Sequence, residues 1–108
     1  VVGDIKGKTC ILFDDIIDTA GTTLSAKQAL LDRGANKDIY VVATHAVFSG
    51  PAIERLKKAK FKEIVVTDSL PVNPKAIPGL RVLRIAPLLA KVIQNIQSGQ
   101  SVTEIYQQ

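Results

Sequence analysis

Hydrophobic residues occur in four short runs, rich in β-branched and aliphatic side chains, which alternate with longer amphipathic segments. The runs are Thr9–Phe13, Ile39–Thr44, Glu63–Thr67 and Arg81–Ile85. Such alternation predicts strands joined by helices in a parallel sheet. The strand interiors CILF and IVV are continuously apolar, which is typical of strands covered by helices on both faces. The pattern therefore predicts a three-layer α/β domain with a parallel sheet of about four or five strands.

Two segments between these runs have the spacing of amphipathic helices. The first should begin at residue 22 or 23 and end at residue 33, because Gly34 can adopt the left-handed conformation that commonly closes a helix. The second should run over residues 51–60, since proline is favoured at the first helical position. Ser49 or Gly50 would supply its N-cap, although both could instead serve a ligand.

A third helix is predicted over residues 87–97 and should end at Ser98 and Gly99. Its apolar stripe comprises Leu88, Leu89, Val92, Ile93 and Ile96. The proline-rich segment SLPVNPKAIPGL, which precedes the fourth strand, reads as a loop. The remaining segment SVTEIY is too short to assign.

Length and composition agree with a single domain spanning residues 1–108, since 46% of the residues are hydrophobic. The sequence begins with Val1 and contains no methionine. We therefore expect it to be a fragment or a processed chain.

The formal charge is +4, from 14 Lys and Arg against 10 Asp and Glu, without a block of like charge. This balance suits anionic ligands but specifies none. The basic cluster Lys57, Lys58, Lys60 and Lys62 has only Phe61 among it. A solvated helix end explains this cluster better than a nucleic-acid interface, so no nucleic-acid partner is predicted.

Cys10, the one cysteine, lies in an apolar run and cannot form an internal disulfide. A buried, reduced thiol in a cytoplasmic protein is the preferred interpretation. No apolar run approaches the roughly 18 residues that span a bilayer, and no signal peptide is evident. We therefore expect a cytoplasmic location and no membrane partner.

The stretch ILFDDIIDTAGTT, residues 11–23, carries the candidate chemistry. Ligands of open parallel sheets gather at the carboxyl ends of the strands, where we expect Asp14 and Asp15 to lie. The residues from Asp18 to Thr23 lead into a helix, so that backbone N–H groups and threonine hydroxyls could face one point. That arrangement predicts a phosphate site, with Gly21 permitting a tight turn and close approach of the ligand.

Carboxylates beside a phosphate site repel the phosphate and need a separate purpose. A ligand with a phosphate at one end and a vicinal diol at the other resolves the conflict, because carboxylates accept hydrogen bonds from hydroxyls. A ribose 5-phosphate unit has that shape. Asp14 and Asp15 would hold its hydroxyls directly or through Mg²⁺, which prefers oxygen ligands.

The residues DDIIDTAGTT after an apolar strand resemble the phosphoribosyl-diphosphate signature of type I phosphoribosyltransferases and ribose-phosphate pyrophosphokinases. The blocks GDIKGKTCILFDDIIDTAGTT, THAVFSGPAIERL and SGQSVTEIY are similar, in order, to the carboxyl-terminal domain of the pyrophosphokinase. The resemblance covers essentially all of the chain. It implies a parallel sheet of the type I phosphoribosyltransferase kind.

The resemblance also implies a reaction, the transfer of the diphosphoryl group of ATP to the C1 hydroxyl of ribose 5-phosphate, giving phosphoribosyl diphosphate and AMP. Asp14 and Asp15 would serve the ribose hydroxyls and a Mg²⁺ reached through the substrate. The substrate-binding set would be Asp14, Asp15, Asp18, Thr19, Ala20, Gly21, Thr22 and Thr23. Such transfers depend mainly on positioning and on neutralisation of phosphate charge.

In the family, a basic catalytic loop and an amino-terminal domain supply much of the ATP and metal site, and neither matches any part of this sequence. We therefore expect no catalytic residue in this fragment, weak binding of ribose 5-phosphate and no synthase activity from the chain alone. Full-length relatives imply a homo-oligomer. The segment Ser101, Val102 and Thr103 is similar to a regulatory phosphate or ADP site between subunits of some relatives, although an ordinary polar tail explains it equally well.

His45 should follow the second strand, at the same edge of the sheet as Asp14. A lone histidine in such a place is more often a structural hydrogen-bonding residue than a catalyst. We therefore favour the structural role over the catalytic one.

Four other functions remain open at this stage. A phosphoribosyltransferase that consumes phosphoribosyl diphosphate would share the same signature, and a noncatalytic pyrophosphokinase-associated module would share the architecture. Asp68 after the third strand allows a receiver-type phospho-switch, although no lysine follows the fourth strand. Finally, Asp14, Asp15 and Asp18 could simply solubilise a loop and face a helix dipole.

Overall fold

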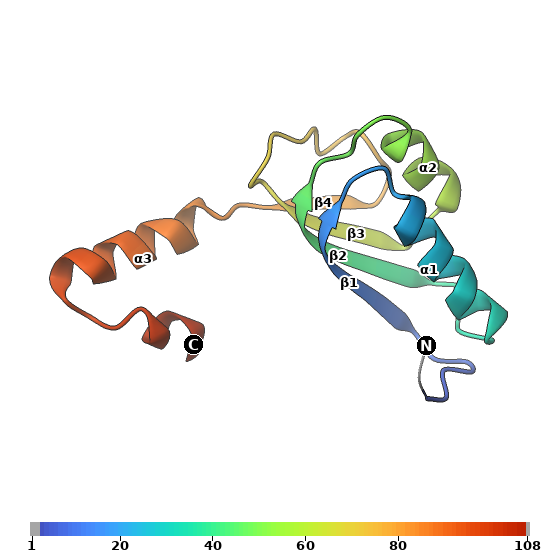
Figure 1. Cartoon of the computed structure of the whole chain (residues 1–108), viewed down its shortest axis with the longest axis horizontal. Helices are drawn as coiled ribbons and strands as arrows, with labels where there is room; N and C mark the ends of the chain where they lie inside the picture. Colours follow the sequence, from blue (N-terminus) through green and yellow to red (C-terminus); the bar gives the residue numbers. More distant parts are fainter. Residues whose placement is uncertain (1–2, 108) are drawn as a thin grey trace.

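Four parallel strands form one sheet in the order β1-β2-β3-β4 in the computed structural model of the chain, which describes residues 3–107 (Figure 1). The strands are β1 (Cys10–Ile17), β2 (Ile39–Ala46), β3 (Glu63–Thr67) and β4 (Leu80–Leu83). Val1, Val2 and Gln108 of the predicted domain lie outside the described residues. The α/β class and the parallel sheet predicted from the sequence are confirmed.

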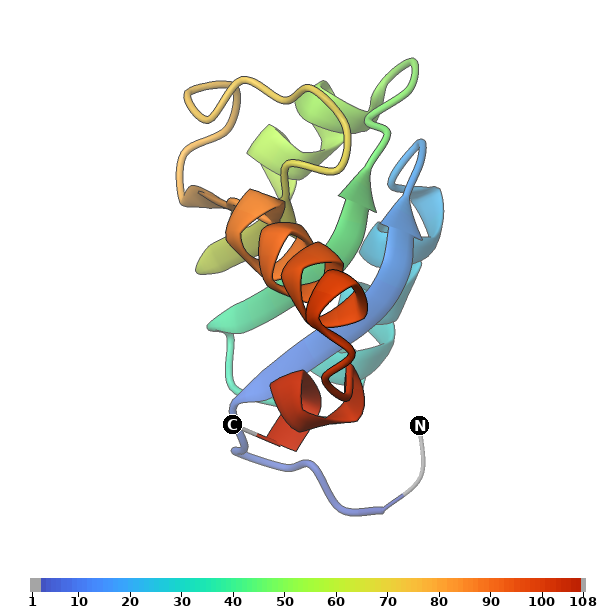
Figure 2. The ribbon, with the colours of Figure 1, turned by 90° about the vertical axis from the view of Figure 1, so that its left-hand side faces the viewer.

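Helices α1 (Gly21–Asp32) and α2 (Ala52–Ala59) connect the first three strands, and both lie on the same face of the sheet (Figures 1 and 2). Each follows a strand and returns the chain to the next parallel strand, as in βαβ units. The loop between β3 and β4 has no helix, in agreement with its three prolines.

Successive residues of a strand point to opposite faces of the sheet, and the register aligns them into rows across the four strands. Leu12, Val41, Ile64 and Leu80 are paired across the sheet and face α1 and α2. The core lies between this face and the helices. Its most buried side chains are Ile17, Ile39, Val41, Leu56, Ile64 and Val66.

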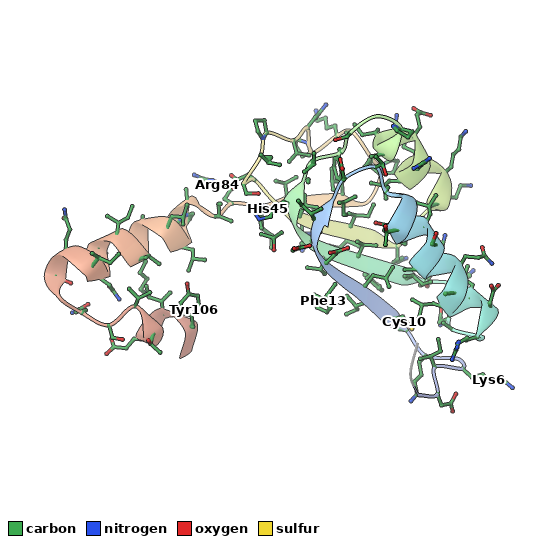
Figure 3. All side chains as sticks on the ribbon, viewed as in Figure 1. Lys6, Cys10, Phe13, His45, Arg84 and Tyr106 are labelled. Atoms are coloured by element: carbon green, nitrogen blue, oxygen red, sulfur yellow. The ribbon has the colours of Figure 1, made fainter. Side chains whose placement is uncertain are left out.

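The opposite face of the sheet has no helix over it among residues 3–107 (Figures 1 and 2). Phe13 projects from β1 on this side and is 75% exposed (Figure 3). The row next to the core row is Phe13, Val42, Val65 and Arg81. The coverage expected on both faces is therefore found on one face within the described chain.

Helix α3 (Ala86–Ser98) leads away from the sheet, and the short 3₁₀ helix η1 (Thr103–Gln107) turns back beside it (Figure 1). The side chain of Asn95 in α3 donates to the backbone oxygen of Ser101, 3.0 Å away, which ties the two elements together. The stripe predicted for this helix forms, but Leu89, Ile93 and Ile96 on it are exposed.

Strands β1 and β2 are both longer than the sequence predicted. Strand β1 continues past Phe13 because Asp14 pairs with Ala43 and Ile17 pairs with Ala46. Backbone pairing does not depend on side-chain polarity, so exposed carboxylates do not end the strand. The extension places His45 inside β2 rather than after it. Strand β4 ends two residues earlier than predicted, at Leu83.

Two of the predicted helix ends are confirmed. Gly34 has a φ of 84°, and the amides of Gly34 and Ala35 bond back to Leu31 and Leu30, which closes α1. Gly99 has a φ of 77° after α3.

The predicted capping of α2 is wrong. Pro51 is its N-cap, without a side-chain cap in the described structure, and the oxygen that Ser49 offers to the amide of Ala52 is its backbone carbonyl, at 3.1 Å. Helix α2 accordingly begins one residue after the predicted start.

Cys10 is free and half-buried in β1, rather than fully buried as expected. It packs at the edge of the core cluster. None of the helices among residues 3–107 combines the length and apolar character needed to cross a lipid bilayer.

Candidate functional site

A hollow of about 280 Å³ opens where β1 ends and α1 begins. It is lined by Asp14, Ile16, Ile17, Asp18, Thr19, Ala20, Gly21, Thr22 and Thr23. We call residues 18–23, where the sequence predicts a phosphate site, the phosphate turn. The structure therefore brings together seven of the eight predicted substrate residues, all except Asp15.

The phosphate turn is shaped by Ala20, which has a φ of 69°. This left-handed conformation is unfavourable for a residue with a Cβ atom. The sequence instead placed the tight turn at Gly21, and that expectation is wrong, because Gly21 is the first residue of α1 and has no positive φ. The methyl group of Ala20 is buried, which helps to hold the turn.

The start of α1 leaves backbone donors for a ligand. Its N-cap Ala20 makes no side-chain cap in the described structure, and the first helical hydrogen bond runs from Leu24 N to Ala20 O at 3.0 Å. The amides of Gly21, Thr22 and Thr23 precede that bond and have no acceptor within the helix. Together with the helix dipole they favour an anion at this end.

Asp14 and Asp15 lie within the second half of β1, not after the strand as expected. The two acids are adjacent, and the backbone amide of Asp15 donates to Asp14 Oδ1. Asp14 lines the hollow, and Asp15 does not. The sequence treated the two acids as a pair, but the strand gives them different positions.

The carboxylate of Asp14 is held in its ionised form. Hydrogen bonding with the side chain of Asp15 is the largest cause that keeps the pKa of Asp14 below its usual range, followed by the backbone amide of Asp15. That amide donates to Asp14 Oδ1 over 2.8 Å. Asp14 is therefore an acceptor at neutral pH, as a partner for sugar hydroxyls must be.

Three successive carbonyls, at the end of β1 and in the turn, accept hydrogen bonds from the segment that leads from β2 into α2. The amides of Val47 and Phe48 donate to Ile17 O at 3.0 and 3.1 Å, and the amide of Ser49 donates to Asp18 O at 2.9 Å. The next carbonyl, Thr19 O, accepts from Arg55 Nη1 at 3.1 Å. The segment from β2 to α2 thus braces the site. Sequence reasoning missed Arg55, although it lies in the block THAVFSGPAIERL.

His45 has a structural partner, as the sequence favoured. Its Nδ1 lies 2.7 Å from Ser69 Oγ, and that hydroxyl also approaches Thr44 O at 3.4 Å. His45 lies at the carboxyl edge of the sheet (Figure 3). The contact fastens the start of the β3–β4 loop to β2.

Asp68 also has a structural use. Its Oδ1 accepts the amide of Ile85 at 2.9 Å, and its own amide donates to Leu83 O at 2.9 Å. These bonds join the end of β3 to the turn between β4 and α3. The carboxylate that a receiver-type switch would use as phosphoacceptor therefore accepts a hydrogen bond from the backbone amide of Ile85.

The segment Ser101, Val102 and Thr103 leads from α3 into η1, of which Thr103 is the first residue, and it is remote in sequence from the phosphate turn. Its local contacts are the Ser101 carbonyl with Asn95 and the Ser101 hydroxyl, which accepts from Thr103 N at 3.2 Å. Its role in regulation stays a prediction.

Among residues 3–107, no group of three or more His, Cys, Asp and Glu side chains is arranged to hold a metal ion. Asp14 and Asp15 fit a Mg²⁺ only in the manner the sequence suggested, through one or two carboxylates with the remaining ligands from substrate and water.

The sequence matches the family described as "Phosphoribosyl synthetase-associated domain" over residues 1–107. The chain belongs to this family. The match spans the sheet, the phosphate turn and α3 together, so the family assignment does not depend on the short signature alone.

Sequence similarity to curated proteins agrees with the family assignment. The chain is 51% identical over 107 residues to a ribose-phosphate pyrophosphokinase of Caldanaerobacter subterraneus subsp. tengcongensis, covering 98% of this chain and 34% of the relative. It is 52% identical to that of Bifidobacterium longum, covering 98% of this chain and 31% of the relative. The predicted resemblance is confirmed, and the chain spans about a third of the length of these curated relatives.

The fold is similar to the crystal structure of phosphoribosylpyrophosphate synthetase from Mycobacterium smegmatis. The TM-score is 0.83 with 48% identity, covering 91% of this chain and 33% of that one. This chain thus corresponds in fold as well as in sequence to one part of that enzyme.

Proposed function

We propose that this chain is the part of a ribose-phosphate pyrophosphokinase that holds ribose 5-phosphate, within the carboxyl-terminal domain of the longer enzyme. The whole enzyme would transfer diphosphate from ATP to ribose 5-phosphate, giving phosphoribosyl diphosphate and AMP. Family membership and the names of the relatives support this proposal. The observation that carries it is the hollow that joins Asp14 to the open start of α1.

The two ends of the hollow suit the two ends of the ligand. Amides of Gly21, Thr22 and Thr23 would donate to the phosphate, where charge-assisted hydrogen bonds are strong. Asp14 would accept a hydrogen bond from a ribose hydroxyl at the other end. An acid beside the phosphate would repel it, so the proposal places Asp14 at the ribose end of the hollow.

Asp15 and Mg²⁺ would act together in the complete enzyme. Mg²⁺ supplies neutralisation of diphosphate charge when bound. Asp15 does not line the hollow and would reach the substrate through bound metal or water. ATP would bind mainly to the remainder of the longer protein.

Thermal protection and calorimetry test the site in this chain. Ribose 5-phosphate should raise Tm, while ribose and inorganic phosphate, each holding one end of the site, should protect less. We expect weak binding and no AMP formation from ATP. A chain that gains no thermal protection at high ribose 5-phosphate would contradict the assignment.

Two matched variants separate the acids. Asp14→Asn should weaken binding of ribose 5-phosphate to this chain, by about tenfold if one charge-assisted hydrogen bond is lost. Asp15→Asn should leave that binding nearly unchanged and should instead lower catalysis in a complete enzyme. Equal losses of binding in both variants would show that the positions within β1 do not decide the roles.

A chimera tests the activity. Residues 1–107 would replace the matching third of the Caldanaerobacter enzyme, and formation of AMP and phosphoribosyl diphosphate would be measured. Activity near that of the parent is expected. The family description "synthetase-associated" keeps a noncatalytic module as a second candidate, and an inactive chimera that still binds ribose 5-phosphate would favour it.

Further properties of the longer enzyme follow from the same proposal. We place it in the cytoplasm as a homo-oligomer, with the exposed segment around Ser101 and Thr103 contributing to a regulatory phosphate or ADP site between subunits. In the chimera, Ser101→Ala should weaken inhibition by ADP. An unchanged inhibition curve would count against a regulatory role.

A further inference from the structure

Arg55 of α2 contacts the phosphate turn although it is 36 residues from Thr19 in the sequence. Its Nη1 donates to Thr19 O over 3.1 Å. The same nitrogen would lie 3.4 Å from a Cβ atom built on Gly21. The guanidinium group therefore touches the turn on both sides of Ala20.

The turn needs such support because Ala20 has a left-handed backbone. Conformations of this kind persist where the surrounding structure determines them. Backbone amides of the β2–α2 segment hold the carbonyls of Ile17 and Asp18, and Arg55 continues the series at Thr19. Without Arg55 the series would end at Asp18, two residues before the strained position.

The contact also sets the direction of a donor. The C=O of Thr19 and the N–H of Ala20 belong to one planar trans peptide and point in opposite directions. A donor that fixes the carbonyl toward α2 consequently turns the Ala20 amide away from α2. The first amides of α1 follow directly after this peptide.

We propose that Arg55 is a positioning residue for the phosphate turn, holding the Thr19–Ala20 peptide so that the amides at the start of α1 face an incoming phosphate. The inference rests on the proposed ribose 5-phosphate site. It also gives Gly21 a neighbour, because a Cβ atom there would already be in van der Waals contact with Arg55 Nη1 at 3.4 Å, so that a branched side chain would press on the guanidinium group.

Geometry, in addition to charge, makes this position suit arginine. A guanidinium group is planar and has five N–H donors in a fixed arrangement, so that one can hold a carbonyl at the end of a rigid fork. A lysine would keep the charge but lose that fixed geometry. Arg55→Lys should accordingly restore part of what Arg55→Gln loses.

The experiment compares Arg55→Gln with Lys58→Gln. Lys58 is a matched control because it removes the same charge from the next turn of α2, in the groove that both residues line beside α1. Binding of ribose 5-phosphate to the 108-residue chain is measured by calorimetry. The ¹⁵N relaxation of the amides from Ala20 to Thr23 is measured without ligand.

We expect Arg55→Gln to weaken binding by about tenfold, to mobilise the Ala20 and Gly21 amides, and to leave Tm within a few degrees of the parent. Lys58→Gln should change neither binding nor amide mobility. Affinity and amide order equal to those of the parent in Arg55→Gln would overturn the proposal, as would a lower Tm with both readouts intact.

The experiment distinguishes failure of the proposed function from failure of the role proposed for Arg55. If the parent chain does not bind ribose 5-phosphate, that function fails, while the ligand-free relaxation data still decide whether Arg55 orders the turn. A double-mutant cycle adds a second criterion. Gly21→Val should weaken binding less in the Arg55→Gln background than in the parent, whereas equal losses in both backgrounds would contradict the explanation of Gly21.

Discussion

The two faces of the sheet both carry mainly apolar side chains, but helices cover only one of them among residues 3–107. On one face the row Leu12, Val41, Ile64 and Leu80 packs beneath α1 and α2. One residue further along each strand, the row Phe13, Val42, Val65 and Arg81 faces away from those helices. Val41 is 1% exposed and Phe13 is 75% exposed. An apolar residue therefore stabilises this chain only where a neighbouring element removes it from water.

The largest effect is expected beneath α2. Leu56 is 1% exposed in the core. Leu56→Ala should lower the free energy of unfolding by about 2–5 kcal/mol, through lost burial and the cavity left behind. Urea unfolding followed by circular dichroism measures the change. A loss below about 1 kcal/mol would mean that this face is not the core of the chain.

A smaller effect is expected at the edge of the covered face. Lys27 of α1 donates to the carbonyl of Ala59, and its Nζ lies 5.2 Å from the ring centroid of the buried Phe61. Lys27→Met keeps most of the aliphatic chain and removes both contacts, so the loss should be about 1 kcal/mol. The same unfolding experiment checks it. Gln28→Met, on an exposed position of the same helix, is the control.

On the uncovered face an ion pair should contribute less. Arg81 Nε lies 3.1 Å from Glu63 Oε1, and the side chain of Arg81 is 69% exposed. Arg81→Gln should lower stability by about 0.2–1 kcal/mol at low salt, and the difference should shrink at high salt as the charges are screened. A difference that is independent of salt would indicate packing rather than charge.

The smallest effect is expected at Phe13. Phe13→Ser should change the free energy of unfolding of this chain by no more than about 0.5 kcal/mol, because most of the side chain is already in water. A loss comparable with that of Leu56→Ala would show that the face is covered in solution. Sedimentation of the parent and the variant at several concentrations would then distinguish self-association from internal packing.

Much of the fold could be predicted because its signals are local. Apolar runs, turn residues and the glycines at positions 34 and 99 identified the strands, the loops and two helix ends. Strand ends were less predictable, since Asp14 and Asp15 look like loop residues. Pairing with β2 keeps both in β1, and such pairing is a property of two segments rather than of one.

The candidate site was predictable in its members and less so in its geometry. Asp14 and the residues from Asp18 to Thr23 line one hollow, as the signature indicated. Asp15, which the signature grouped with these residues, does not line the hollow. Arg55 could not be derived from local pattern, because its contact with Thr19 joins segments 36 residues apart.

By itself, the sequence determined the class of the fold and the order of its elements, and it predicted which residues line the hollow, because propensity and residue type act over a few neighbouring positions. Tertiary structure decided which of two acids enters the hollow, which residue takes the strained φ, and which apolar row becomes the core. Those outcomes depend on what packs against each side chain. Segments far away in the sequence supply that packing, so it cannot be read from the local pattern around each residue.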